Sequence, residues 1–206
     1  MHTSTSEVYG TARAIPIDES HPLRAQSPYA ASKIGADKLA EAFHYSFGLP
    51  VVTVRPFNTY GPRQSARAIV PTIVSQCLSE EVVRLGNVQP IRDLTFVDDT
   101  VQGFLLAAKT ASAIGQTINL GTGRGIRIGD LAELIMRIVG RSIPMECETQ
   151  RVRPEQSEVD RLVADSTLAK TVLGWHPTVS LEDGLERTVH WMRQELSHYR
   201  SHAYSI

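Results

Sequence analysis

The sequence predicts an α/β fold with a mainly parallel sheet, and two observations support this prediction. Segments rich in β-branched residues alternate along the chain with segments whose apolar residues recur at helical spacing. The chain has 206 residues, of which 42% are hydrophobic, so it is long and apolar enough to bury a core. Alternating strands and helices are typical of parallel strands joined by crossover helices.

The first and longest predicted helix spans residues 28–47. Its apolar residues recur at helical spacing, a proline suits its first turn, and Gly48 suits its end. A second helix, over 97–111, opens with Asp98 and Asp99, which suit the positive end of a helix dipole and which we interpret as structural. Further helices are predicted over 68–79, 127–140 and 179–196.

The predicted strands lie between these helices. A β-branched run within 49–62 follows the first helix and leads into Pro56. Shorter runs at 82–86 and 116–123 predict two more strands, and a Ser/Thr cluster at 4–6 ends another strand at the start of the chain. The alternation of strand and helix therefore extends through most of the sequence.

Charge and composition exclude several classes of partner. Lys and Arg number 21 against 22 Asp and Glu, so no basic field predicts binding to nucleic acid or to an anionic membrane. No apolar run approaches the roughly 20 residues that span a bilayer, and the opening residues lack the features of a signal peptide. We therefore expect a cytoplasmic protein in which Cys77 and Cys147 are buried free thiols. His198 and His202 stand at helical spacing without a third ligand nearby, so no metal site is expected.

Tyr29 and Lys33 form the first candidate for chemistry. They stand four residues apart in "YAASK", near the start of the first helix, so their side chains share one face. A nearby ammonium favours the phenolate and lowers the pKa of a tyrosine hydroxyl, which makes a proton acceptor near neutral pH. The hydroxyl cluster at 4–6 adds weight to this pair, because one of its members could hydrogen-bond a substrate hydroxyl.

A Ser/Thr, Tyr and Lys set of this kind resembles the catalytic triad of the short-chain dehydrogenase/reductase superfamily. Its extended branch comprises nucleotide-sugar epimerases, dehydratases and decarboxylases, and six motifs follow here in the order and spacing of that branch: "STSEVYG", "SPYAASK", "RPFNTYGPRQ", "RDLTFVDDT", "NLGTG" and "LGWHPTVSLEDGL". The resemblance extends to about residue 195. It looks closest to the 4,6-dehydratases that act on UDP- or GDP-N-acetylglucosamine on the way to legionaminic acid.

The resemblance implies the C-terminal part of a Rossmann-type doubly wound parallel sheet plus a smaller α+β substrate-binding domain. Residues 1–60 and 92–122 would belong to the NAD-binding domain, and residues 61–91 and 123–206 to the substrate-binding domain. The strand and GxxGxxG turn that hold the NAD pyrophosphate in this superfamily have no counterpart in the sequence. The stretch "TINLGTGRGIRIGDLAEL" imitates them, but Ile126 stands where the helix must pack closely, so we interpret it as the return into the substrate-binding domain.

The resemblance also implies a bound NAD, a nucleotide-diphosphate sugar as substrate, and a homodimer built on the helix that contains Tyr29. The implied catalytic residues are Thr5, Ser6, Glu7, Tyr29 and Lys33. The implied NAD contacts are Ser4, Tyr29, Lys33, Pro56 and Asn58. The implied substrate contacts are Asn58, Arg67, Arg92 and Arg153, since guanidinium forks suit a diphosphate.

Glu7 favours one reaction within this branch. A 4-epimerase needs only hydride transfer at C4 and a tyrosine that moves the hydroxyl proton. A 4,6-dehydratase must also remove the C5 proton and expel the C6 hydroxyl, which needs a carboxylate beside the sugar. Ser6 stands where dTDP-glucose dehydratases carry an aspartate, so Glu7 would serve as both base and acid, or a water would assist.

We therefore expect a 4,6-dehydratase acting on an NDP-N-acetylhexosamine. Two alternatives stay open. One is a UDP-sugar 4-epimerase or a UDP-glucuronate-type decarboxylase of the same branch. The other is a non-catalytic fragment that binds a nucleotide sugar.

Overall fold

The structure of the chain is a computed structural model that describes residues 1–152 and 154–199. Its α-helices are α1 (Pro28–Phe47), α2 (Ile69–Ser79), α3 (Val97–Lys109), α4 (Ile128–Val139) and α5 (Leu181–Gln194). Short 3-10 turns span Ser6–Tyr9, Ala111–Ala113, Thr149–Arg151, Glu155–Ser157 and Leu196–His198, and a π-helical turn spans Ala169–Leu173. The five predicted helices are confirmed, each end falling within two residues of its expected position.

The strands are β1 (His2–Thr3), β2 (Thr53–Pro56), β3 (Asn58–Tyr60), β4 (Val83–Leu85), β5 (Ile91–Phe96), β6 (Thr117–Leu120), β7 (Gly125–Arg127), β8 (Met145–Cys147) and β9 (Arg161–Leu162). One parallel sheet has the order β1-β2-β6. In a second sheet, β5 pairs in parallel with β3 and β9 and antiparallel with β7. A separate two-stranded sheet pairs β4 in parallel with β8. The predicted α/β class with mainly parallel strands is confirmed.

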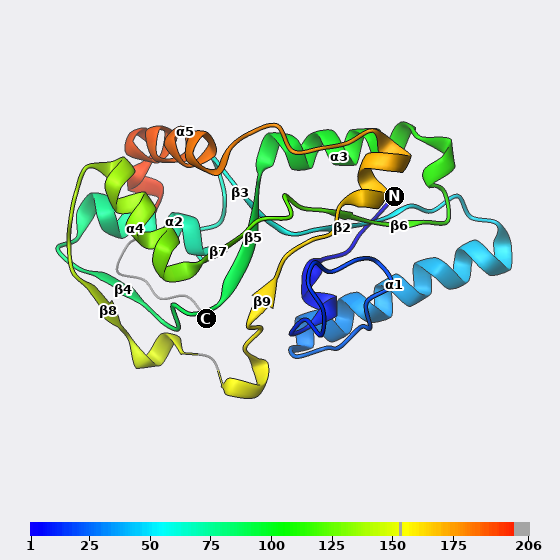
Figure 1. The fold of residues 1–206 in the computed structure, drawn as a ribbon, viewed down its shortest axis with the longest axis horizontal. Helices are drawn as coiled ribbons and strands as arrows, with labels where there is room; N and C mark the ends of the chain where they lie inside the picture. Colours follow the sequence, from blue (N-terminus) through cyan, green and yellow to red (C-terminus); the bar gives the residue numbers. More distant parts are fainter. Residues whose placement is uncertain (153, 200–206) are drawn as a thin grey trace.

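Helices cover both faces of the β1-β2-β6 sheet, with α3 above it and α1 below it in Figure 1. Neighbouring residues of β2 show the same division, because side chains of a strand alternate between faces. Val54 is fully buried in a cluster with Ala107 of α3, whereas Arg55 bonds Asp37 of α1. The sheet is thus packed on both sides.

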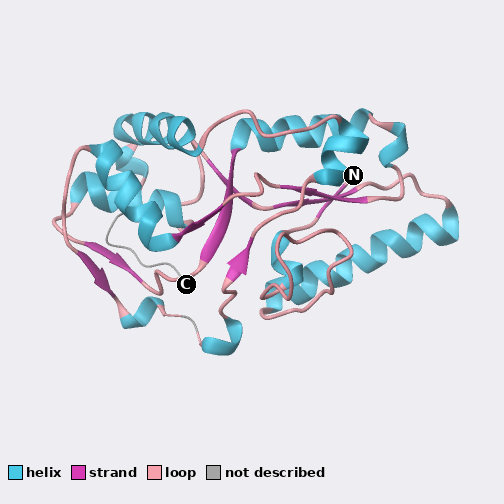
Figure 2. Cartoon of the chain, viewed as in Figure 1, coloured by secondary structure: helices cyan, strands magenta, loops and turns pink. Residues whose placement is uncertain are grey.

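Figure 2 shows that α2, α4 and α5 gather at the other end of the molecule with the β4–β8 ribbon. The largest apolar cluster lies there and includes Ile73, Leu131, Ile135 and Leu185. The β5 strand runs between the two groups of helices and pairs with β3, β7 and β9. The domain boundaries at 60/61, 91/92 and 122/123 stay predictions.

The sequence shows why α1 begins and ends where it does. The Oγ of Ser27 accepts a hydrogen bond from the backbone N–H of Ala30, and Pro28 fills the first helical position, where no N–H partner is needed. At the other end Gly48 adopts a left-handed conformation (φ 65°) and donates its N–H to the carbonyl of His44. A side chain at Gly48 would strain this ending.

Two strand predictions need correction. The run within 49–62 forms two strands rather than one, because Pro56 offers no N–H to a further neighbour and the chain then pairs with β5 instead of β6. The short strands β7, β8 and β9 were not predicted, and neither was the six-residue strand β5. Its buried charged residues Arg92 and Asp93 disrupt the apolar pattern, and the structure satisfies them with specific partners.

The glycine-rich stretch after β6 is not a dinucleotide fingerprint. A carboxylate of the protein takes the backbone N–H groups that a phosphate would otherwise bind: Asp93 accepts from the N–H of Thr122 (2.8 Å) and of Gly123 (2.8 Å). The strand β7 then separates the turn from α4. The stretch thus leads from β6 to β7, which belong to different sheets, and its interpretation as the return into the substrate-binding domain stays a prediction.

Cys77 and Cys147 are both free thiols. Cys77 is buried in the largest cluster, but the predicted burial of Cys147 is wrong because it lies exposed on the β4–β8 ribbon, whose strands pair only with each other. Among residues 1–152 and 154–199 no helix is both long and apolar enough to cross a bilayer. The same residues contain no group of three or more His, Cys, Asp or Glu side chains arranged to hold a metal ion. His202 lies outside the described residues.

Candidate active site

The turn after β1 positions the first group of predicted site residues. Ser4 continues the pairing of β1 by donating its N–H to the carbonyl of Val54 (2.8 Å), and Thr5 then caps the 3-10 turn Ser6–Tyr9. The Oγ1 of Thr5 accepts from the N–H of Glu7 (3.3 Å), which leaves the Thr5 hydroxyl proton free to donate elsewhere. The Ser4 Oγ is buried without a hydrogen-bond partner.

The first turns of α1 carry the second group. Lys33 donates from Nζ to the carbonyl of Thr3 (3.1 Å), which ties the helix to the end of β1, two residues before Thr5. The same Nζ lies 6.0 Å from the centroid of the Tyr29 ring. Tyr29 is 52% exposed, so its hydroxyl is open to a ligand. We call the group Ser4, Thr5, Ser6, Glu7, Tyr29 and Lys33 the Tyr29 edge.

A buried polar network fixes the turn of Glu7 against α1. Burial raises the pKa of Tyr9, so its hydroxyl stays protonated and donates to Oδ1 of Asn119 (2.7 Å) while accepting from Arg55 Nη1 (2.9 Å). Arg55 in turn donates from Nη2 to Oδ2 of Asp37 in α1 (2.8 Å). The network therefore joins the turn, the sheet and the helix.

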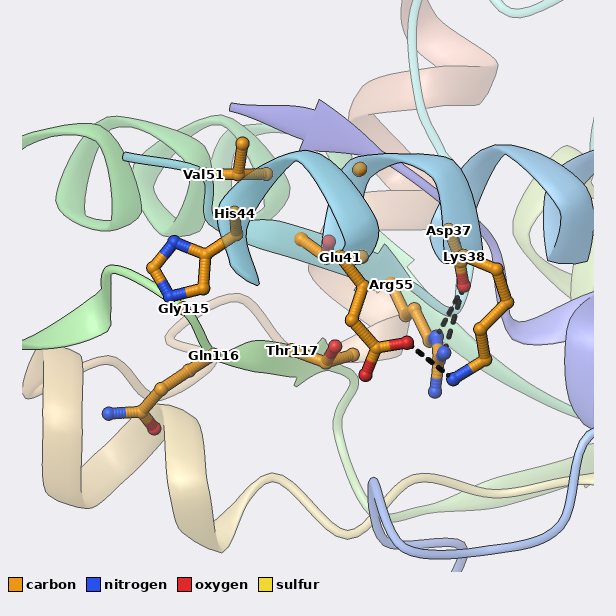
Figure 3. A pocket seen from close by; sticks show the side chains of 11 residues that line it. Asp37, Lys38, Glu41, His44, Val51, Arg55, Gly115, Gln116 and Thr117 are labelled. Carbon is orange, nitrogen blue, oxygen red and sulfur yellow. Dashed lines mark hydrogen bonds and ion pairs between the residues drawn. The ribbon is translucent and has the colours of Figure 1, made fainter. Parts of the chain in front are cut away.

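Figure 3 shows the Arg55 guanidinium beside Asp37, within a pocket of about 40 Å³ between α1 and the strands β2 and β6. Lys38 and Glu41 also line this pocket and form an ion pair with each other (2.7 Å). The pocket is too small for a nucleotide sugar, and several of the charged groups around it already have partners. We interpret it as part of the packing that holds α1.

A larger cavity of about 620 Å³ lies between α2, β5 and the segment before β9, and we call it the arginine cavity. Asn58, Arg67 and Arg92, which the sequence predicts as substrate contacts, all line it. The other charged lining residues are Arg151 and Glu158, so three guanidinium groups face one carboxylate. Guanidinium groups suit a diphosphate.

Three of the charged residues of the arginine cavity, Arg92, Arg151 and Glu158, are held by specific contacts. Arg92 and Glu158 are 10% and 13% exposed, and Arg92 Nη2 lies 3.5 Å from Glu158 Oε1. Arg92 Nη1 also donates to the carbonyl of Ile91 (3.1 Å), and Arg151 pairs with Glu148. Two amide oxygens, Asn58 Oδ1 and Gln64 Oε1, are buried in lining residues and have no hydrogen-bond partner.

The structure thus gathers the predicted residues into two groups. Members of the Tyr29 edge are not among the residues that line the arginine cavity in the described chain. Pro56 ends β2 and is half-buried, and Asn58 follows it at the start of β3. Arg153 lies outside the described residues.

Sequence reasoning missed six polar residues of the cavity lining: Thr59, Gln64, Thr72, Asn87, Arg151 and Glu158. Gln64 stands inside the quoted "RPFNTYGPRQ" motif, so its position was available as a signal. Glu158 gave no such signal, because its pairing with Arg92 depends on how β9 lies beside β5.

A family model described as GDP-mannose 4,6 dehydratase matches residues 1–188. The chain belongs to this family. The match includes every residue of the Tyr29 edge and the whole lining of the arginine cavity. Membership confirms the predicted relationship to nucleotide-sugar dehydratases and epimerases.

Both activities occur among similar proteins. The chain is 34% identical to the dTDP-glucose 4,6-dehydratase of Streptomyces griseus over 96% of its own length and 59% of that protein. A solved dTDP-glucose 4,6-dehydratase from Bacillus anthracis, in complex with NAD, matches with a TM-score of 0.88 at 26% identity, over 96% of this chain and 62% of that one.

A UDP-glucuronic acid 4-epimerase from Bacillus cereus, solved with UDP-glucuronic acid and NAD, matches with a TM-score of 0.87 at 31% identity, over 94% of this chain and 61% of that one. The chain thus spans about 60% of the length of the curated relatives it matches. These matches confirm the Rossmann-type fold class.

Proposed function

We propose that the chain carries the catalytic and substrate-binding residues of an NAD-dependent nucleotide-sugar 4,6-dehydratase. The observation that carries this proposal is the placement of a carboxylate, Glu7, on a turn capped by Thr5 and tied through the Tyr9 network to the helix of Tyr29 and Lys33. A dehydratase needs a carboxylate in addition to a tyrosine and its lysine, because water must be lost across C5 and C6.

The residues at the Tyr29 edge fit the nicotinamide end of NAD. The Ser4 Oγ is buried there without a partner, so a polar group of a bound ligand would satisfy it. Tyr29, Lys33, Pro56 and Asn58 are the further proposed contacts. A bound NAD would supply an acceptor and then a donor of hydride.

The proposed mechanism assigns a proton to each of three residues of the edge, Tyr29, Thr5 and Glu7. Tyr29, beside the Lys33 ammonium, takes the proton of the C4 hydroxyl, while the free hydroxyl proton of Thr5 hydrogen-bonds the same oxygen. Glu7 removes the C5 proton, which the C4 ketone makes acidic, and then gives a proton to the departing C6 hydroxyl. Ser6 is buried in the same turn and completes the proposed catalytic set.

We propose an NDP-N-acetylhexosamine as the substrate, bound in the arginine cavity. Arg92 and Arg67 would hold the diphosphate, with Arg153 as a further proposed contact. The buried oxygens of Asn58 and Gln64 support a ligand that carries N–H or O–H groups, since a donor would satisfy them. The cavity volume of about 620 Å³ lies within the range of sites for small organic ligands.

A 4-epimerase is the second candidate, because a UDP-glucuronic acid 4-epimerase matches nearly the whole chain. The two activities differ in their products. We expect the chain, incubated with NAD and UDP-N-acetylglucosamine, to form a 4-keto-6-deoxy sugar that mass spectrometry detects by the loss of water. An isomer of unchanged mass would show an epimerase instead, and a chain that binds UDP-N-acetylglucosamine without measurable affinity for NAD would show a binding role only.

We also propose a homodimer that forms through α1. Leu39, Phe43 and Phe47 recur every four residues on this helix and are 60%, 44% and 76% exposed, so they form an apolar stripe. Light scattering of the purified chain tests this proposal, and Phe43→Ser should shift a dimer toward monomer.

The free thiols of Cys77 and Cys147 support a cytoplasmic location, which fractionation of cells would check.

A further inference from the structure

Gln26 makes three hydrogen bonds with its side-chain amide, although it belongs to neither group of predicted site residues. Its Oε1 accepts from the N–H of Thr11 (2.5 Å). Its Nε2 donates to the carbonyls of Gln156 (3.1 Å) and Glu158 (3.0 Å), which stand 130 and 132 residues further along the chain. The side chain therefore joins segments that are remote in sequence.

Each of these segments belongs to one region of the candidate site. Thr11 follows the turn that carries Glu7, and Glu158 lines the arginine cavity, where it pairs with Arg92. Gln26 itself directly precedes Ser27, the cap of α1, and so lies close in sequence to Tyr29. One amide thus contacts the backbone on both sides of the boundary between the Tyr29 edge and the arginine cavity.

The chemistry of the contacts fixes the orientation of this amide. Carbonyl oxygens can only accept, so the NH2 group must face Gln156 and Glu158, and the oxygen must face the N–H of Thr11. The neighbouring Gly10 allows this approach, because a Cβ there would lie 2.6 Å from the Gln26 oxygen and 2.6 Å from the Arg24 carbonyl. A glutamate could accept from Thr11 but could not donate to the two carbonyls.

We propose that Gln26 is a positioning residue that holds the segment of Glu158, and through it the Arg92 guanidinium, at a fixed place relative to the Glu7 turn. The inference rests on the proposed function for the assignment of the cavity to a nucleotide sugar. Gln26 touches neither the diphosphate nor the reacting atoms. Its contribution is to set the distance between the arginine cavity, which would bind the diphosphate, and the Tyr29 edge, which would carry the reacting groups.

Three variants of the full chain test this role. Gln26→Met is neutral and removes all three hydrogen bonds, whereas Gln26→Glu keeps an acceptor for Thr11 and loses both donations. Gln116→Met is the matched control, because that amide also donates to a backbone carbonyl, of Ser112 (2.6 Å), but lies directly before β6 and lines neither region of the candidate site. Hydrogen–deuterium exchange of peptides over 10–13 and 154–162, UDP affinity by calorimetry, and the unfolding temperature are measured for each.

We expect faster exchange over 154–162 in both Gln26 variants, and over 10–13 in Gln26→Met alone. UDP affinity should fall about fivefold in both, as expected for the loss of contacts worth about 1 kcal/mol. The unfolding temperature should move no more than in Gln116→Met, which should bind UDP like wild type. Unchanged exchange over 154–162, or unchanged UDP affinity in the Gln26 variants, would overturn the inference. A wild-type chain that does not bind UDP refutes the proposed function of the cavity, and the exchange data still decide whether Gln26 holds the segment.

Discussion

The Tyr29 edge and the arginine cavity are built in different ways. At the edge, the backbone is held firmly by β1, the Thr5 cap and the Tyr9 network, while the side chain of Tyr29 stays half exposed. In the cavity, the side chains of Arg92 and Glu158 are themselves held, since they are nearly buried and face each other. The comparison teaches that the two regions depend largely on separate sets of contacts, so that most changes in one should leave the other intact.

The largest expected effect comes from a change at the Tyr29 edge that leaves the arginine cavity intact. In an active preparation, Glu7→Gln should lower the rate of water loss by about 10²- to 10⁴-fold, because a general acid–base carboxylate contributes on this scale. Formation of the 4-keto-6-deoxy product is the measurement. UDP affinity should stay unchanged, and the exposed Glu133→Gln variant is the matched control. A Glu7→Gln protein with normal turnover would exclude the dehydratase mechanism.

The second prediction disturbs the cavity and spares the edge. Arg92→Met should weaken UDP binding by about 10- to 100-fold, since hydrogen bonds to a charged group are worth about 1.5–3 kcal/mol. Calorimetric titration with UDP measures the loss. Arg187→Met, at an exposed position of α5, should bind UDP like wild type. Equal affinities for Arg92→Met and wild type would place the diphosphate elsewhere.

A third change tests the contacts that Asp93 of β5 makes outside both regions. Asp93 accepts from the N–H groups of Thr122, Gly123 and Ala164 and from the Thr122 hydroxyl. Asp93→Asn places an NH2 group against one of these donors and should cost about 2 kcal/mol in the free energy of unfolding, as measured in urea. The exposed Asp98→Asn should change it by less than about 0.5 kcal/mol. A loss confined to UDP affinity would show a role in ligand binding instead.

The smallest expected effect comes from the apolar core beneath the arginine cavity. Burial raises the pKa of the Cys77 thiol from 9.0 to about 11. Because the pKa is higher in the folded state than in the unfolded state, the neutral thiol contributes to the free energy of unfolding. This contribution is fully present below pH 9 and is lost as the pH rises toward 11. The free energy of unfolding of wild type should therefore fall between pH 9 and 11 by up to about 2 kcal/mol more than that of Cys77→Ala.

Comparing how the free energy of unfolding changes with pH in wild type and in Cys77→Ala removes the contributions of the buried tyrosines, because both proteins contain them. Cys147→Ala removes the exposed thiol and is the matched control, so its slope should equal that of wild type. Parallel curves for wild type and Cys77→Ala would show that the Cys77 thiol does not ionise in the folded protein within this range.

The helices and the closeness of Tyr29 to Lys33 could be predicted from sequence because their signals are local, whereas the role of Glu7 came from the family resemblance. Ser27, Pro28 and Gly48 mark the ends of α1, and helical spacing alone places Tyr29 beside Lys33. The cavity could be predicted only in part. Asn58, Arg67 and Arg92 came from a family resemblance, whereas Glu158 and Gln26 act through partners far away in the chain, and no local pattern specifies such pairs.

The glycine-rich turn after β6 shows how a familiar motif can arise for steric reasons. A Cβ at Gly121 would lie 2.4 Å from that of Ala164, and one at Gly125 would lie 2.5 Å from the Ile91 side chain, while Gly123 has a φ of 74°. Gly121 and Gly125 are thus required by a crowded crossing of the chain and Gly123 by its backbone conformation, and the Asp93 carboxylate accepts from the amides that a phosphate would otherwise bind. The spacing of the glycines alone would indicate a nucleotide site here. The hydrogen bonds from the backbone N–H groups of Thr122 and Gly123 to Asp93 show that these donors are already used.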